Sequence, residues 1–228
     1  MVHGSELGLF LKQFKRDVLI QLRQIRFLVN FCLFFFIILF IFPLTLKPEI
    51  QFLRSIAPGL VWMGLLLAML LSAEHLFQED YELGIIEQWL VSGYSLTGLV
   101  CAKVFAHWLL ILVPLMLSMP IVALLFSLNL WETWVLFLSL LCGTPALLFL
   151  CALAASFGMG VNQKGALMAL ILLPLTLPLL IFGSGTVHIA MQDLPIGGFL
   201  ALLLAMSLLA FGFLPFAIAG IIRISYAD

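Results

Sequence analysis

Six long apolar stretches constrain the fold of this chain more than any other feature of its sequence. They cover residues 28–46, 56–73, 104–128, 133–157, 165–184 and 199–222. A helix of about 20 residues crosses a bilayer core about 30 Å thick. Lipid offers no hydrogen-bond partner to the backbone, so each span must pair its own N–H and C=O groups, as a helix does. None of the six stretches contains Asp, Glu, Lys or Arg. The sequence therefore predicts an all-α polytopic membrane protein with six transmembrane helices, in a single membrane domain covering 1–228.

The composition supports this class and excludes others. Apolar residues make up 64% of the chain and charged residues 9%, whereas soluble domains are about half apolar and a quarter charged. The formal net charge of −1 gives no basic surface of the kind that binds nucleic acid. The four cysteines form no C-x-x-C pair, so we predict neither a metal site nor a disulfide framework.

Lysine and arginine are distributed unevenly between the two sides of the predicted helices. An even number of spans puts both termini on one side, and that side carries Lys12, Lys15, Arg16, Arg23, Arg26, Lys103, Lys164 and Arg223. The other side carries only Lys47 and Arg54. Basic loops stay in the cytoplasm. We therefore predict a bacterial inner-membrane protein with both termini cytoplasmic.

The segment before the first span, residues 5–26, has the pattern of an amphipathic helix. Its apolar residues recur at helical spacing, at Leu7, Leu11, Phe14, Val18, Leu22 and Ile25. Its basic residues lie on another part of the helical wheel. Such a helix lies along the cytoplasmic interface, where anionic lipids attract it. The alternative is a helix that packs under the bundle, and both can hold at once.

The longest polar segment on the predicted cytoplasmic side covers residues 74–96. It holds five of the 11 acidic residues of the chain, namely Glu74, Glu79, Asp80, Glu82 and Glu87, with apolar residues between them. A short helix with one acidic and one apolar face is suited to docking into a groove on a soluble partner. A loop that is merely solvated would not need the apolar residues. We interpret the segment as a cytoplasmic coupling segment.

No catalytic motif is apparent. The sequence contains neither the P-loop pattern G-x-x-x-x-G-K-[ST] nor the pattern H-E-x-x-H. We therefore expect a non-catalytic subunit that takes its energy from a separate ATPase, which binds the ATP. Transport driven by an ion gradient is the alternative, but such pathways usually place Asp or Glu inside the membrane, and the six stretches contain none.

Five strings resemble those of one family in their order and spacing. They are IAPGLVWMGLLLAMLLSAEHLFQED (56–80), AKVFAHWLLILVPL (102–115), GTPALLFL (143–150), LLPLTLPLLIFG (172–183) and LPIGGFLALL (194–203). On these strings the chain resembles the CcmB family, the haem exporter B subunits of cytochrome c maturation, along nearly its whole length. The resemblance implies an ABC-2-like permease subunit, which agrees with the six predicted spans.

The resemblance also implies partners. Members of the family dimerise, bind a cytoplasmic ATPase, CcmA, and associate with the haem-handling subunit CcmC, the small subunit CcmD and the periplasmic haem chaperone CcmE. We thus expect a homodimer with a CcmA-like ATPase docked on Phe77, Glu79, Asp80, Glu82, Gly84, Ile86, Glu87, Gln88, Trp89 and Leu90. The sequence departs from the family at Leu83 and Gly93, where the family has an acidic residue and a proline.

Three residues are candidate haem contacts. Histidine and methionine are axial ligands that haem iron accepts, and His188 and Met191 lie three residues apart in the last external loop. Two such neighbours cannot easily reach opposite faces of one porphyrin. His107 lies inside the third span. A polar side chain at such a position more often bonds to a neighbouring helix than to a ligand. We expect the chain alone to bind no cofactor, and haem to be a substrate of the complex.

Three functions are compatible with these observations. The favoured one is the permease subunit of an ABC complex for cytochrome c biogenesis, which couples ATP hydrolysis to haem export or to release of the haem-loaded chaperone. An ABC-2 exporter of lipid or polysaccharide would share the topology and the coupling segment. A non-transporting scaffold would only relay the movements of the ATPase to a haem-handling neighbour. The full-length string match favours the first and the third.

The orientation can be tested with single cysteines. Cysteines placed at Lys164 and at Gln192 in a cysteine-free background should differ in their reaction with an impermeant maleimide added to cells. We expect the site at Gln192 to react and the site at Lys164 to stay protected, because eight of ten basic residues lie on the Lys164 side. Labelling of the Lys164 site from outside would reverse the predicted orientation.

Overall fold

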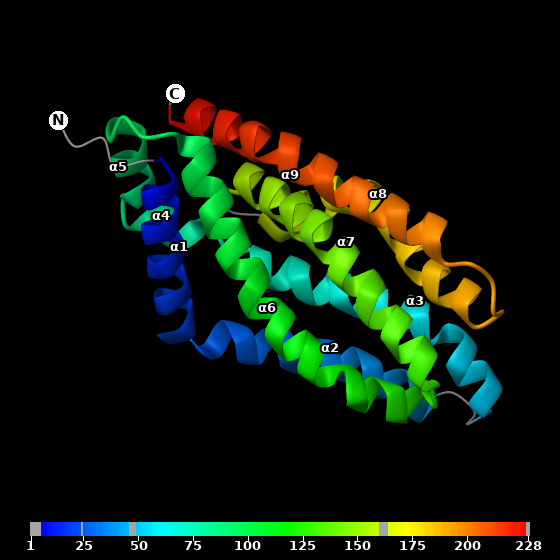
Figure 1. Cartoon of the computed structure of the whole chain (residues 1–228). Helices are drawn as coiled ribbons and strands as arrows, with labels where there is room; N and C mark the ends of the chain where they lie inside the picture. The colour runs from blue at the N-terminus through cyan, green and yellow to red at the C-terminus, as the bar shows by residue number, and fades with distance from the viewer. Residues whose placement is uncertain (1–5, 24, 46–48, 160–163, 227–228) are drawn as a thin grey trace.

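The computed structural model describes residues 6–23, 25–45, 49–159 and 164–226, and this part of the chain is helical and contains no strand (Figure 1). In chain order the helices are α1 (Glu6–Arg23), α2 (Ile25–Thr45), α3 (Ile50–Ala73), α4 (Gln78–Glu82), α5 (Ile85–Val91), α6 (Leu96–Phe126), α7 (Leu130–Phe157), α8 (Lys164–Ala190) and α9 (Gly197–Ser225). Among the described residues, six helices are long and apolar enough to cross a membrane: α2, α3, α6, α7, α8 and α9. The predicted all-α fold with six spans is confirmed.

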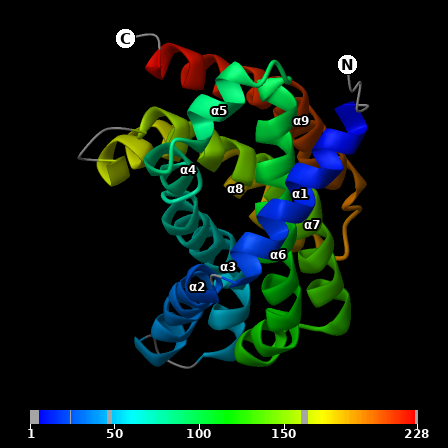
Figure 2. The ribbon, with the colours of Figure 1, turned by 90° about the vertical axis from the view of Figure 1, so that its left-hand side faces the viewer.

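The spanning helices run between two ends of the molecule that differ in content. Helices α1, α4 and α5 lie together with the C-terminal residues at one end, which we call the terminal end (Figure 1). The opposite end, which we call the loop end, carries the α6–α7 and α8–α9 connections. Helix α1 crosses in front of α6, against which it packs (Figure 2). The short helices thus gather at the terminal end.

Large apolar side chains cover the outside of the bundle as well as its core. On α9, Leu208, Phe213 and Phe216 are exposed, whereas Ser207 is buried. A soluble protein avoids wide exposed apolar surfaces, but a helix in lipid requires them. The distribution of side chains on α9 is therefore that of a helix with lipid on one side and protein on the other.

All six spanning helices begin before the residue that the sequence predicts, and the two with the largest differences, α3 and α6, each include a charged residue that has a partner. Helix α3 begins at Ile50 rather than at 56 and so includes Arg54, which forms a bidentate ion pair with Glu132 in the first turn of α7. Helix α6 begins at Leu96 rather than at 104 and includes Lys103. The predicted spans excluded charges, since a charge at a helix centre costs about 2.5–3.5 kcal/mol. A paired charge near a helix end escapes most of this cost.

Trp62 of α3 fills the space between three helices. Its ring is fully buried, and a Cβ added at Gly143 of α7 or at Gly183 of α8 would overlap ring atoms. Glycines at helix contacts let backbones approach closely. Here they leave room for the largest side chain, so α7 and α8 both pack directly on the indole.

The backbone hydrogen bonds of α7 are interrupted at Pro145, and a side chain of α9 bonds to the backbone there. Pro145 has no N–H to offer the carbonyl of Leu141, so one intrahelical hydrogen bond is missing. At the next position, the Ser207 hydroxyl accepts a hydrogen bond from the Ala146 N–H at 3.3 Å and donates to the Cys142 carbonyl. It lies between a donor and an acceptor that would pair in a regular helix. The Ser207 side chain therefore gives the Ala146 N–H and the Cys142 carbonyl hydrogen-bond partners that lipid could not provide.

We predict that Gly183→Ala lowers the thermal stability of the detergent-solubilised protein, because the new methyl group would overlap the Trp62 ring. Overpacking of this kind costs about 1–3 kcal/mol. Gly212→Ala on α9 is the matched control: nothing lies within 4 Å of a Cβ at that position, and alanine is the better helix former. Equal unfolding temperatures for the two variants would contradict the role of Gly183.

Candidate functional site

The predicted coupling segment folds into the two short helices α4 and α5. Gly84 joins them with a φ of 66°, a left-handed conformation that glycine adopts without steric cost. Gly93, with a φ of 73°, makes a second turn after α5. Ser95 then caps α6 by accepting a hydrogen bond from the Gly98 N–H at 3.2 Å. These residues fold the segment back over the terminal end.

Four of the ten residues predicted to contact an ATPase face the interior of the chain. Phe77, Ile86 and Trp89 are buried among apolar side chains, and Asp80 is buried as well. The burial of the three apolar residues holds α4 and α5 against the spanning helices. This inward-facing role was not predicted, because the order of acidic and apolar residues does not reveal which side of each short helix faces inward.

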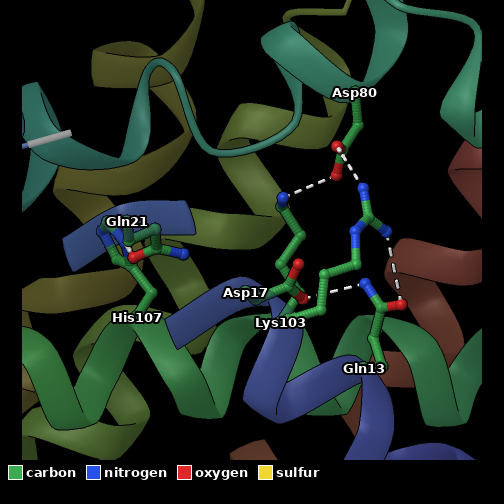
Figure 3. A network of polar contacts seen from close by, with 7 residues as sticks. Gln13, Asp17, Gln21, Asp80, Lys103 and His107 are labelled. Carbon is green, nitrogen blue, oxygen red and sulfur yellow. Dashed lines mark hydrogen bonds and ion pairs between the residues drawn. The ribbon is translucent and has the colours of Figure 1, made fainter. Parts of the chain in front are cut away.

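Asp80 belongs to a network of polar side chains beneath α4 (Figure 3). Lys103 Nζ of α6 donates a hydrogen bond to Asp80 Oδ2 at 2.5 Å, and Arg16 Nη2 of α1 lies 3.9 Å from Asp80 Oδ1. Asp80 and Lys103 are only 6% and 7% exposed. One carboxylate therefore joins α1, α4 and α6, which are far apart in the sequence.

Helix α1 turns a polar stripe toward α6. Gln13, Asp17 and Gln21 follow one another at four-residue spacing, so they share a face of the helix. Gln13 Nε2 donates to Asp17 Oδ2 at 2.9 Å, and both residues are buried. Burial raises the pKa of the Asp17 carboxyl, and the positive charge of Lys103 opposes that rise. The apolar periodicity of residues 5–26 does not reveal this polar stripe.

The predicted apolar stripe of α1 forms only part of the contact with the bundle, through the ring of Phe14, whose centroid lies 5.9 Å from that of Phe105 in α6. Leu11 and Leu22 are exposed, and Phe14 is half-buried. The side chains of Leu7 and Ile25 lie outside the part that the structure describes. Helix α1 packs against α6, so the alternative of a helix that packs under the bundle holds. Its contact with the membrane interface stays a prediction.

His107 is held by two neighbouring helices. Its Nε2 lies 3.0 Å from Ser72 Oγ of α3, and its Nδ1 lies 2.9 Å from Gln21 Oε1 of α1. The imidazole is buried. The expectation that His107 bonds to a neighbouring helix is confirmed.

The outward side of α4 and α5 is acidic, with apolar residues among the acids. The exposed polar residues are Glu79, Glu82, Glu87 and Gln88. Leu83 is 71% exposed and Val91 84% exposed, and neither was among the predicted contacts. Both lie outside the spanning helices, so water would contact them unless a partner covers them. We call these six residues the docking face.

The C-terminal end of α9 also contacts the coupling segment. The ring centroids of Tyr81 in α4 and Tyr226 after α9 lie 5.6 Å apart. Burial raises the pKa of the Tyr226 hydroxyl, and the negative charge of Glu87 adds to this rise. The coupling segment is thus connected to α1, α6 and the end of α9.

The candidate haem ligands lie at opposite ends of the bundle. His188 is exposed in the last turn of α8, which runs on to Ala190, so it is helical rather than part of a loop. Met191 follows it at the loop end and is half-buried. His107 lies toward the terminal end, against α1. In the part of the chain that is described, no cluster of three or more His, Cys, Asp or Glu could hold a metal ion.

Comparison with known proteins agrees with this architecture. The family described as CcmB protein matches residues 8–225. A heme exporter protein B of Pseudomonas aeruginosa is 44% identical over 213 residues, which are 93% of this chain and 96% of the relative. Proteins of the same name from Haemophilus influenzae and Escherichia coli are 42% and 38% identical, over 95% of this chain and 98% and 99% of theirs. With a match of this length and these identities, the chain belongs to the CcmB family.

Proposed function

We propose that this chain is the permease subunit of an ATP-driven haem exporter in the bacterial inner membrane, which serves cytochrome c maturation. The family match over residues 8–225 carries the proposal, and the relatives named heme exporter protein B support it. Six apolar helices supply the membrane domain. The sequence has no P-loop motif, so the proposal assigns ATP binding to a separate CcmA-like subunit.

The docking face is the proposed contact for that ATPase. It presents three glutamates around the exposed side chains of Leu83 and Val91. A soluble partner with an apolar groove and a basic rim would complement it, because opposite potentials guide encounter while apolar contacts supply affinity. The docking face lies on short helices whose inner sides are buried against the bundle. A partner that binds there would therefore be connected to the spanning helices through α4 and α5.

Further partners are proposed for the membrane-embedded surfaces. Spanning helices associate in lipid through close packing and hydrogen bonds, and the exposed sides of the six helices leave room for such contacts. A second copy of this chain, a CcmC-like haem-handling subunit and a CcmD-like small subunit would bind there. A CcmE-like chaperone would approach from the loop end if that end is periplasmic, as predicted.

A non-transporting scaffold is the second candidate, and the packing inside the bundle favours it. Trp62 fills the space between α3, α7 and α8 and leaves no room for a Cβ at Gly143 or Gly183. A bundle packed in this way would pass the movements of an ATPase to a haem-handling neighbour. An exporter of lipid or polysaccharide has less support, because the relatives are named for haem.

Charge reversal on the docking face tests the coupling. We expect Glu82→Lys together with Glu87→Lys to reduce the ATPase that co-purifies with the chain by roughly tenfold, as two lost attractions of up to about 1 kcal/mol each would do. The amount of chain in the membrane should stay unchanged, because both side chains are exposed. Co-purification from membranes at low and at high salt measures the association, and high salt should weaken the wild-type complex.

The control for this experiment is Glu49→Lys. Glu49 is an exposed acid that precedes α3 at the other end of the bundle, and its side chain makes no capping hydrogen bond. The same charge change there should leave recovery of the ATPase as in the wild type. If the double variant recovers as much ATPase as the control, the docking face is not the contact.

Haem should not be held by this chain alone. Both ring nitrogens of His107 lie within hydrogen-bond distance of neighbouring helices, and His188 lies at the other end of the bundle, so the two cannot ligate one iron. We expect no strong Soret band in the chain purified without partners, and a band when a haem-handling subunit is co-expressed. The spectra of the wild type and of His188→Ala measure this. A Soret band in the isolated wild type that is lost in the variant would make the chain a haem carrier itself.

A further inference from the structure

Helix α4 depends on its surroundings for its orientation. It has five residues, and a helix so short is not stable by itself in water. Of these five, all of which the structure describes, Asp80 is the one that is buried. Its neighbours Glu79 and Glu82 belong to the docking face. Phe77 at its start and the Tyr81–Tyr226 contact also hold α4, but the direction in which it presents these glutamates depends as well on what holds Asp80.

Lys103 holds Asp80 and is itself fixed in a spanning helix. Its Nζ is 2.5 Å from Asp80 Oδ2, and the buried carboxyl of Asp17 in α1 lies near the same ammonium (Figure 3). One turn further along α6, His107 contacts Ser72 of α3 and Gln21 of α1. The α6 face that carries Lys103 is thus joined to α1, α3 and α4 at once.

A buried ion pair is weak evidence for stability, because apolar side chains of similar volume often stabilise a fold equally well or better. A charged pair, in contrast, fixes one relative orientation of the groups that carry it. A pair that joins a short surface helix to a spanning helix is therefore best explained by the orientation that it imposes on α4.

We propose that Lys103 is a positioning residue that sets the orientation of α4, and with it the docking face, relative to the spanning helix α6. Through this bond a displacement of α4 reaches α6 directly, through Arg16 it reaches α1, and through the contacts of His107 it reaches α1 and α3. The positioning role of Lys103 concerns this chain alone. Its consequence for the coupling of ATP hydrolysis to the spanning helices rests on the proposed docking of an ATPase.

A spin label at Leu83→Cys, the C-cap residue of α4, measures how firmly α4 is held in the purified full-length chain, in a cysteine-free background. We expect the double variant Lys103→Met/Asp80→Asn to increase the mobile fraction of the label at least threefold. The double variant is used because removal of one partner would leave a buried charge unpaired and could prevent folding. Asp17→Asn is the matched control, since it alters a buried carboxyl near Lys103 that has no hydrogen bond to α4. Its label should stay as in the parent.

Recovery of the ATPase from the complex provides the second measurement. We expect it to fall about fivefold in the double variant and to stay unchanged in Asp17→Asn. An unchanged label in the double variant overturns the positioning role, and so does equal loosening in Asp17→Asn. A loosened label with full recovery of the ATPase leaves the positioning role intact and overturns the docking function of the segment instead.

Discussion

Lipid offers no hydrogen-bond partner to a polar group, and this constraint explains where the polar side chains of the molecule lie. The Ser207 hydroxyl turns inward to the break in α7, while large apolar residues of α9 face outward. Two ion pairs involve charged residues near the ends of spanning helices: Arg54 of α3 with Glu132 of α7, and Lys103 of α6 with Asp80 of α4. Each pair joins two elements, so the constraint that isolates the helices from water also decides how they are connected.

The apolar stretches were sufficient to predict the class, the number of spans and the folding of both ends to one side, because length and hydropathy determine these properties directly. The starts of α3 and α6 were not predictable in this way. Whether a helix continues through Arg54 depends on a partner 78 residues away, and for Lys103 the partner is 23 residues away. The composition of the local sequence does not reveal such a distant partner. The four-residue spacing of Gln13, Asp17 and Gln21 was a usable signal, and it would have identified the inner side of α1.

The coupling segment shows what a single sequence can and cannot say about a site. Its mixture of acids and apolar residues predicted a short helix with one acidic and one apolar face, but it did not say which residues lie on which face. Asp80 and Glu82 are both acidic and two positions apart, yet the first is bonded inside the chain and the second is exposed. The difference comes from the spanning helix beneath. The proposed docking face therefore has six residues rather than the ten predicted, and it includes Val91, which no pattern of charge would select.

The position of Ser207 has a consequence for the order in which the protein is made. Ala146 precedes Ser207 by 61 residues, so at synthesis rates of about 5–20 residues per second α7 leaves the ribosome about 3–12 s before the hydroxyl that bridges it exists. During that interval the backbone groups beside Pro145 have only their own helix to bond with. Helix α7 reaches its final shape when α9 arrives beside it. The last span to be synthesised thus completes the hydrogen bonding of one made earlier. In a nascent chain that stalls before α9 is made, α7 would lack the Ser207 hydroxyl.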